Sequence, residues 1–136
     1  MGDTVDLDRP GRLRLRLERV RVEPTTADGS EWDAGSAPDL LAQGWVGDRQ
    51  VLLTEAVEDA LEVEWPAEAA TSRRFDLGPK TPVRVKVLDA DVSFNDPIGV
   101  IELRPSAADA KSQRRFRLAA GRVAELVLVI EEAPAE

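Results

Sequence analysis

Short segments in which apolar and polar residues alternate recur along this chain, and they restrict its fold more than any other feature. Residues 83–87 place three valines at alternate positions, and residues 13–17 do the same with three leucines. A period of two directs the apolar side chains to one face of a β-strand. The spacing therefore predicts strands that are buried on one side.

About eight such segments, separated by turn residues, predict one all-β domain, an eight-stranded antiparallel β-sandwich. The chain shows neither an internal repeat nor a regular alternation of strands with helices. Gly47 and Asp48 fit a two-residue hairpin turn. Residues 57–70 are expected to form a crossing loop with at most a helical turn, and residues 107–112 a helical turn. The expected strands are residues 12–22, 40–46, 50–56, 72–77, 83–88, 100–104, 114–118 and 123–130.

The first expected strand changes the positions of its apolar residues partway along. Leucines alternate over residues 13–17, and the apolar positions then move to Val20 and Val22. A one-residue slip of this kind predicts a β-bulge near Glu18 and Arg19. We expect this strand to lie at a sheet edge, with its arginines in solvent.

Length and composition fit a single domain of ordinary size. The chain has 136 residues, of which 43% are hydrophobic, so residues 12–131 are expected to form the domain and residues 1–11 and 132–136 its tails. The formal net charge of −8 argues against a nucleic-acid partner. No apolar run approaches the ~20 residues of a membrane span, and a cytoplasmic protein is expected. The ratio of 15 arginines to 3 lysines is typical of a GC-rich bacterial genome.

Two residue types that carry much of enzyme chemistry are absent from the chain. It contains no cysteine and no histidine, which excludes disulfides, thiolate nucleophiles, the usual zinc ligands and the usual general base. Only carboxylates remain as catalytic candidates, and no enzymatic activity is expected. A glycosidase or carbohydrate-binding sandwich is disfavoured, because the chain has no tyrosine and only three tryptophans for stacking on sugars.

Aspartates cluster in two loops that can meet at one end of a sandwich. The first loop supplies Asp33 and Asp39, six residues apart, and the second supplies Asp89, Asp91 and Asp96. Five carboxylates in one cleft would repel one another unless a cation lay between them. Calcium takes six to eight oxygen ligands in flexible geometry, which suits loops better than the strict octahedron of magnesium. These residues are therefore candidate calcium ligands.

The same residues give the chain a resemblance to the C2 domain, the calcium- and lipid-binding module named after the second conserved region of protein kinase C. The resemblance extends from Arg12 to Glu131, and the order of strands and loops looks like the phospholipase-type topology of this Greek-key sandwich. The matching motifs are Leu88-Asp89-Ala90-Asp91, Asp96-Pro97-Ile98-Gly99, the pair Asp33 and Asp39, and Thr54 followed by Leu61-Glu62-Val63-Glu64-Trp65.

The resemblance implies a function for the acidic loops. In this family bound calcium bridges to anionic lipid headgroups, and apolar residues at the loop tips enter the membrane interface. Val92 and Phe94 occupy such a tip here, so they are expected to contact an anionic membrane or a partner protein. The long first loop also leaves Asp28 or Glu31 as alternatives to Asp33 as a ligand. Peripheral attachment to a membrane from the cytoplasm is the expected location.

A second function remains open at this stage. Many members of the family have lost metal binding, so the chain is alternatively a structural or protein-interaction module of a larger bacterial assembly, with or without calcium. Its 5 matching aspartates favour the calcium-binding hypothesis.

Overall fold

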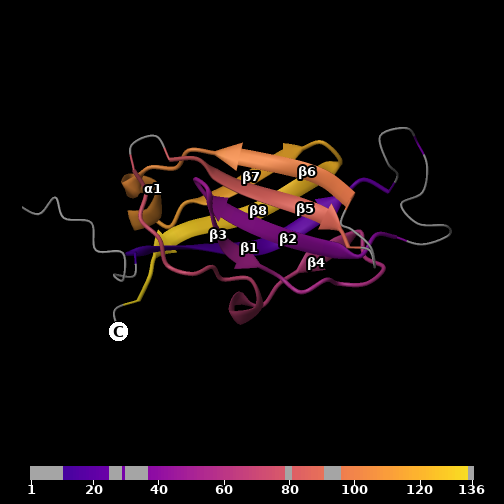
Figure 1. The fold of residues 1–136 in the computed structure, drawn as a ribbon, viewed down its shortest axis with the longest axis horizontal. Coiled ribbons are helices and arrows are strands. Elements are labelled where there is room, and N and C mark those ends of the chain that lie inside the picture. Colours follow the sequence, from indigo (N-terminus) through magenta and orange to yellow (C-terminus); the bar gives the residue numbers. More distant parts are fainter. Residues whose placement is uncertain (1–10, 25–28, 30–36, 79–80, 91–95, 135–136) are drawn as a thin grey trace, which may run out of the picture.

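The computed structural model describes residues 11–24, 29, 37–78, 81–90 and 96–134. They form two four-stranded antiparallel sheets that lie one over the other (Figure 1). The first sheet has the order β4 (Glu62–Glu64), β1 (Leu13–Val22), β8 (Val123–Glu132) and β7 (Arg115–Ala120). The second has the order β3 (Arg49–Leu53), β2 (Leu40–Val46), β5 (Val83–Asp89) and β6 (Asp96–Leu103). The predicted eight-stranded β-sandwich is confirmed.

Two short helical segments accompany the strands. The 3-10 helix η1 (Ala67–Ala69) follows β4, and the helix α1 (Ala107–Lys111) follows β6 as predicted. Ser106 and Asp109 form a capping box at α1, in which each side chain accepts a hydrogen bond from the backbone N–H of the other. No helix in the described part of the chain is long and apolar enough to cross a membrane.

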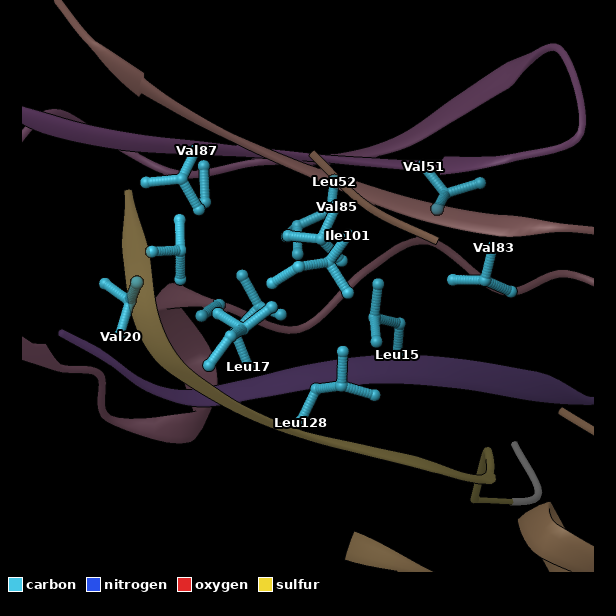
Figure 2. Packing of buried hydrophobic residues seen from close by; sticks show 14 of the residues in the cluster. Leu15, Leu17, Val20, Val51, Leu52, Val83, Val85, Val87, Ile101 and Leu128 are labelled. Atoms are coloured by element: carbon cyan, nitrogen blue, oxygen red, sulfur yellow. The ribbon is translucent and has the colours of Figure 1, made fainter. Parts of the chain in front are cut away.

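The hydrophobic core lies between the sheets and contains apolar residues of the two alternating segments, residues 13–17 and 83–87. Leu15 and Leu17 of β1 are fully buried, as are Val83, Val85 and Val87 of β5. In Figure 2 these side chains extend from the two sheets into the same layer. Burial of apolar surface of this kind is the main term that stabilises a folded domain.

The bulge that the sequence predicts in β1 is confirmed. The register between β1 and β8 shifts between Leu17 and Arg19. The extra residue, Glu18, lets Leu17 and Val20 both be fully buried although their positions differ in parity.

The predicted hairpin between β2 and β3 is also confirmed. Val46 pairs with Arg49 across the two-residue turn, and Gly47 in that turn has a φ of +57°, a conformation that favours glycine. β3 ends at Leu53, earlier than the expected residue 56.

The expectation that β1 would be an edge strand was wrong, because β1 lies between β4 and β8. Its arginines lie on the outer face of the first sheet, around β1, β7 and β8. We call this surface the arginine face; its ion-paired residues are Arg14, Arg16, Glu18, Arg19, Arg115, Glu125 and Glu131. Arg16 and Arg19 pair across strands with Val129 and Val127 of β8, which are 2% and 4% exposed. The apolar stems of arginines cover such valines while the guanidinium groups stay near water.

Four guanidinium groups of the arginine face, those of Arg14, Arg16, Arg19 and Arg115, are paired with glutamates. Glu131 lies 2.5 Å from Nη2 of Arg14 and 3.2 Å from Nη2 of Arg16. Arg19 forms an ion pair with Glu125. Glu18 in the bulge accepts a hydrogen bond of 2.5 Å from Nε of Arg115 on β7. These arginines are thus part of the fold rather than a free basic surface.

Two further segments differ from the prediction. Residues 62–64 form the short strand β4 instead of a loop, and residues 72–77 form no continuous strand. Instead, isolated bridges join Phe75 in this segment to Leu13, and Thr71 directly before it to Arg16. In β4 only Val63 is buried, between two exposed glutamates, so its alternation is too short to be detected in the sequence.

Candidate functional site

Three of the predicted acidic residues, Asp39, Asp89 and Asp96, lie where β2 begins, β5 ends and β6 begins. In the ladders of the second sheet, Leu40 pairs with Asp89, and Asp89 pairs with Asp96. Asp39 directly precedes β2. Strand pairing thus brings the backbones of three aspartates, distant in sequence, to one end of the sheet.

Asp39 and Asp89 are joined by hydrogen bonds. Oδ1 of Asp89 accepts a hydrogen bond of 3.0 Å from the backbone N–H of Asp39, and the N–H of Ala90 donates to the carbonyl of Asp39 at 2.8 Å. Asp89 is only 5% exposed. Because a buried carboxylate is costly unless it is hydrogen-bonded or paired, this backbone contact offsets part of the cost and fixes the orientation of Asp89.

Asp59 is a residue at this end of the sheet that the sequence analysis missed. Its backbone N–H donates to Oδ1 of Asp39 at 2.9 Å, and its own Oδ1 accepts from the N–H of Ala37 at 2.7 Å. Two hydrogen bonds between Leu40 and Val57 hold the Asp59 turn against β2. Asp59 has a φ of +52°, which aspartate tolerates in turns. In the sequence, the only sign of Asp59 is that an aspartate occurs in a turn. Its contact with Asp39 joins residues 20 positions apart, so local patterns do not indicate it.

Several predicted site residues lie outside the described part of the chain. They are Asp33, Asp91, Val92 and Phe94, together with the alternatives Asp28 and Glu31, and the side chain of Asp96 is likewise not described. Within the described residues, no group of three or more acidic side chains could hold a metal ion. Asp39 and Asp89 are therefore the described part of the candidate site.

The chemistry of these two residues fits a hard cation. Carboxylate oxygens are the ligands that calcium prefers, and it needs six to eight oxygens in total. Asp39 and Asp89 each accept a backbone N–H through Oδ1. Outer hydrogen bonds of this kind orient the carboxylates that bind a metal. Two such carboxylates can supply only part of the oxygen ligands that calcium needs, and the remaining ligands would have to come from the two loops.

Ile98 and Gly99, which close the second motif, have a packing role. Ile98 is 4% exposed, and its carbonyl accepts a hydrogen bond of 3.0 Å from the N–H of Arg122. A Cβ at Gly99 would lie 2.5 Å from the carbonyl oxygen of Ala120. Glycine thus permits β6 to approach the turn between β7 and β8. This contact fixes the end of the acidic loop to the first sheet.

Thr54 and Trp65, which also support the resemblance, serve the fold. Thr54 is 3% exposed, and its hydroxyl accepts a hydrogen bond of 3.0 Å from the N–H of Ala42. Trp65 packs against the core, and its backbone N–H donates to the carbonyl of Glu18 at 3.0 Å. Thr54 thus joins the segment after β3 to β2, and Trp65 joins the end of β4 to β1.

No protein-family model matches this chain, and no curated protein matches it either.

Comparison with solved structures identified the fold. A structure described as a C2 domain has a TM-score of 0.71 and 18% identity, covering 90% of this chain and 98% of that chain. A C2 domain of plant Extended Synaptotagmin 1 has a TM-score of 0.70 and 15% identity, covering 94% and 98%. A calcium-bound structure of two C2 domains of Extended-Synaptotagmin 2 has a TM-score of 0.59 and 16% identity, covering 91% and 46%. At these identities the similarity establishes the fold.

Proposed function

Because the chain has the fold of a C2 domain, we propose that it is a non-catalytic module that binds calcium and docks on the anionic surface of a phospholipid membrane. The observation that supports this most is the pair Asp39 and Asp89. Two carboxylates lie on neighbouring strand ends, and each is oriented by a backbone N–H. The proposed ligands are Asp33, Asp39, Asp89, Asp91 and Asp96.

Charge provides the mechanism for calcium-dependent docking. The chain has a formal net charge of −8, so without calcium its acidic loops would be repelled by an anionic membrane. Each bound calcium ion would cancel two of these charges and reverse the interaction, as in other electrostatic switches at membranes. Val92 and Phe94 are proposed to enter the interface, where apolar side chains gain from leaving water.

Thermal unfolding tests the calcium site directly. A ligand that binds only the folded state stabilises it by about 2.7 kcal/mol at a concentration 100 times its Kd. For a chain of this size we expect the Tm to rise by several degrees in millimolar calcium and to return when a chelator is added. The absence of any shift in millimolar calcium would contradict the proposed metal binding.

Paired variants assign the effect of calcium to the site. Asp89→Asn keeps the shape of the side chain and an oxygen that can accept the N–H of Asp39, but removes the charge that would bind the cation. It is expected to abolish the calcium shift. The matched control is Asp48→Asn, which removes one charge from the exposed turn between β2 and β3. If the control loses the shift equally, binding is not at the proposed site.

Co-sedimentation with liposomes separates the membrane partner from a protein partner. Liposomes rich in phosphatidylserine are expected to bind the chain in calcium and to release it in chelator. Phe94→Ala should weaken this binding while leaving the calcium shift of the Tm nearly unchanged. A chain that binds calcium but no anionic liposome would favour the alternative, an interaction module of a larger assembly.

A further inference from the structure

A groove with a volume of about 700 Å³ opens between the edges of the two sheets, and none of the candidate calcium ligands is among its lining residues. One wall comes from Leu53 at the end of β3 and the residues that follow it, and the other from β4, Trp65 and η1. β3 and β4 are the outermost strands of their sheets on this side (Figure 1). We call this feature the acidic groove.

Apolar side chains are unusually exposed around the acidic groove. Leu53 is 60% exposed and Val57 is 37% exposed, and both line it. Leu61, directly before β4, is also 37% exposed. Single exposed hydrophobic residues are ordinary, but several around one concave surface indicate a place where another molecule binds.

The polar lining of the acidic groove has one sign of charge. Its glutamates are Glu55, Glu62, Glu64 and Glu68, and no lysine or arginine is among the lining residues. None of these four glutamates forms an ion pair with another described residue. A cationic occupant would therefore meet carboxylates that form no ion pair within the described part of the chain. Arg21 and Arg19 of β1 lie across the ladder from Glu62 and Glu64.

The backbone of β4 provides the third element of recognition. The carbonyl of Leu61 accepts the N–H of Val22, and the N–H of Trp65 donates to the carbonyl of Glu18. Odd-numbered residues of this segment thus bond to β1, and the alternation of an antiparallel ladder turns the N–H and C=O groups of Glu62 and Glu64 away from it. Unpaired groups along a strand edge are a template for an added strand.

We propose that the acidic groove binds an extended segment of a partner polypeptide in which basic and apolar residues alternate, added as a strand beside β4. The charge of the lining selects lysine or arginine, and the exposed leucine and valine select apolar side chains. Alternation follows from the geometry of strands, because Glu62 and Glu64 lie on the opposite face of β4 from Val63. Main-chain hydrogen bonds give affinity in this mode, and alternate side chains give specificity.

The probe is a capped, dye-labelled nonapeptide of alternating arginine and valine, titrated against the folded chain by fluorescence anisotropy. The titration is done in excess chelator and at about 50 mM salt, where electrostatic contacts are weakly screened. Calcium-dependent docking is thereby absent, so this test and the calcium test can fail independently. Saturable binding is expected, and the absence of binding would overturn the proposal.

Charge variants locate the binding site. The double variant Glu62→Gln with Glu64→Gln is expected to weaken binding on the order of ten-fold, because two opposed charges at the interface are removed. Its control is Asp48→Asn with Glu58→Gln, which lowers the net negative charge equally at exposed positions outside the groove lining. The control should change affinity less than about two-fold. Equal weakening in both variants would show attraction by net charge alone and would overturn the proposal.

A backbone-modified probe tests strand addition. Two versions of the same peptide carry N-methyl groups on alternate residues, one version on the odd-numbered and the other on the even-numbered residues. Each version keeps its charges but cannot donate backbone hydrogen bonds along one of its two edges. One version is expected to lose on the order of ten-fold in affinity, since main-chain hydrogen bonds carry affinity in this mode. Hydrogen exchange at the N–H groups of Glu62 and Glu64 should slow when the unmodified peptide binds. Unchanged affinity for both versions, or dimerisation of the chain through β4 in place of peptide binding, would overturn the proposal.

Discussion

The arginine face and the acidic groove are both rich in charge, but they differ in whether the charges are paired within the chain. On the arginine face, Glu18, Glu125 and Glu131 each form an ion pair with at least one arginine. In the acidic groove, no ion pair among the described residues involves the lining glutamates Glu55, Glu62, Glu64 and Glu68.

This difference separates charge that serves the fold from charge that is available to a partner. Arginine stems cover the outward valines of β8, so the ion pairs of that face maintain a layer that would otherwise be exposed. The carboxylates of the acidic groove form no such ion pair among the described residues, although Glu62 and Glu64 lie across the ladder from Arg21 and Arg19. Removing charge should therefore cost stability on the arginine face and little in the acidic groove.

Among the charged residues of the two regions, Glu131 is expected to contribute most to the free energy of unfolding. Its side chain is 9% exposed and contacts Arg14 and Arg16, which are 30% and 25% exposed. Glu131→Ala should lower the free energy of unfolding by about 1.5–3 kcal/mol, the range for hydrogen bonds to charged groups. Urea unfolding at pH 7 measures the loss. The exposed neighbour gives the control Glu132→Ala, and a similar loss in both would remove the distinction between paired and unpaired acids.

A smaller, pH-dependent effect is expected at Glu18. The hydrogen bond from Arg115 is the main cause that lowers the pKa of Glu18 from its usual 4.5, with the charges of Arg115, Arg16 and Arg19 adding to it. A carboxylate whose pKa is lowered on folding stabilises the folded state above pH 4.5 and loses that contribution as the pH falls through the folded pKa. Because the side chains of Glu18 and Arg115 are 27% and 55% exposed, the contribution should stay below about 1 kcal/mol.

The variant Glu18→Gln measures that contribution. It should be less stable than the unmodified chain at pH 7, and in urea unfolding the difference should shrink progressively as the pH falls below 4.5 and through the lowered folded pKa. High salt at pH 7 should also reduce the difference, since the pair is partly exposed. A difference that persists at low pH would assign the role of Glu18 to packing in the bulge.

The smallest effect is expected in the acidic groove. The double variant Glu62→Gln with Glu64→Gln should change the free energy of unfolding by no more than about 0.5 kcal/mol, as is usual for exposed positions that form no ion pair. Urea unfolding at pH 7 measures it alongside Glu131→Ala. A loss above about 1 kcal/mol would mean that these carboxylates stabilise the fold, contrary to the comparison.

Local patterns predicted most of the fold. The alternation of residues 13–17 and 83–87, the slip near Glu18 and the turn at Gly47 and Asp48 each indicated a local geometry that the structure contains. β4 escaped prediction because three residues are too few for a period of two to be distinguished from a loop. Neighbouring glutamates and alanines, which favour helices, pointed away from a strand there.

The candidate calcium site could be predicted in part. Asp39 and Asp89 followed from their spacing and from the strand before the second loop, and the structure brings them into hydrogen-bond contact. Asp59 could not be identified in this way, because its contact with Asp39 depends on the turn after β3 folding back onto β2. The roles of all the predicted site residues in binding stay predictions, those of Asp39 and Asp89 included.

By itself, the sequence determined the class of the fold and the acidic loops, because strand periodicity, turn residues and carboxylate spacing are local properties of the chain. Only the tertiary structure decided which strands are edges. β1, expected at an edge, lies inside its sheet, whereas the inconspicuous β4 lies at the edge beside the acidic groove. Strand order is set by contacts between residues far apart in sequence, and so it decides which arginines are neutralised and which glutamates remain available.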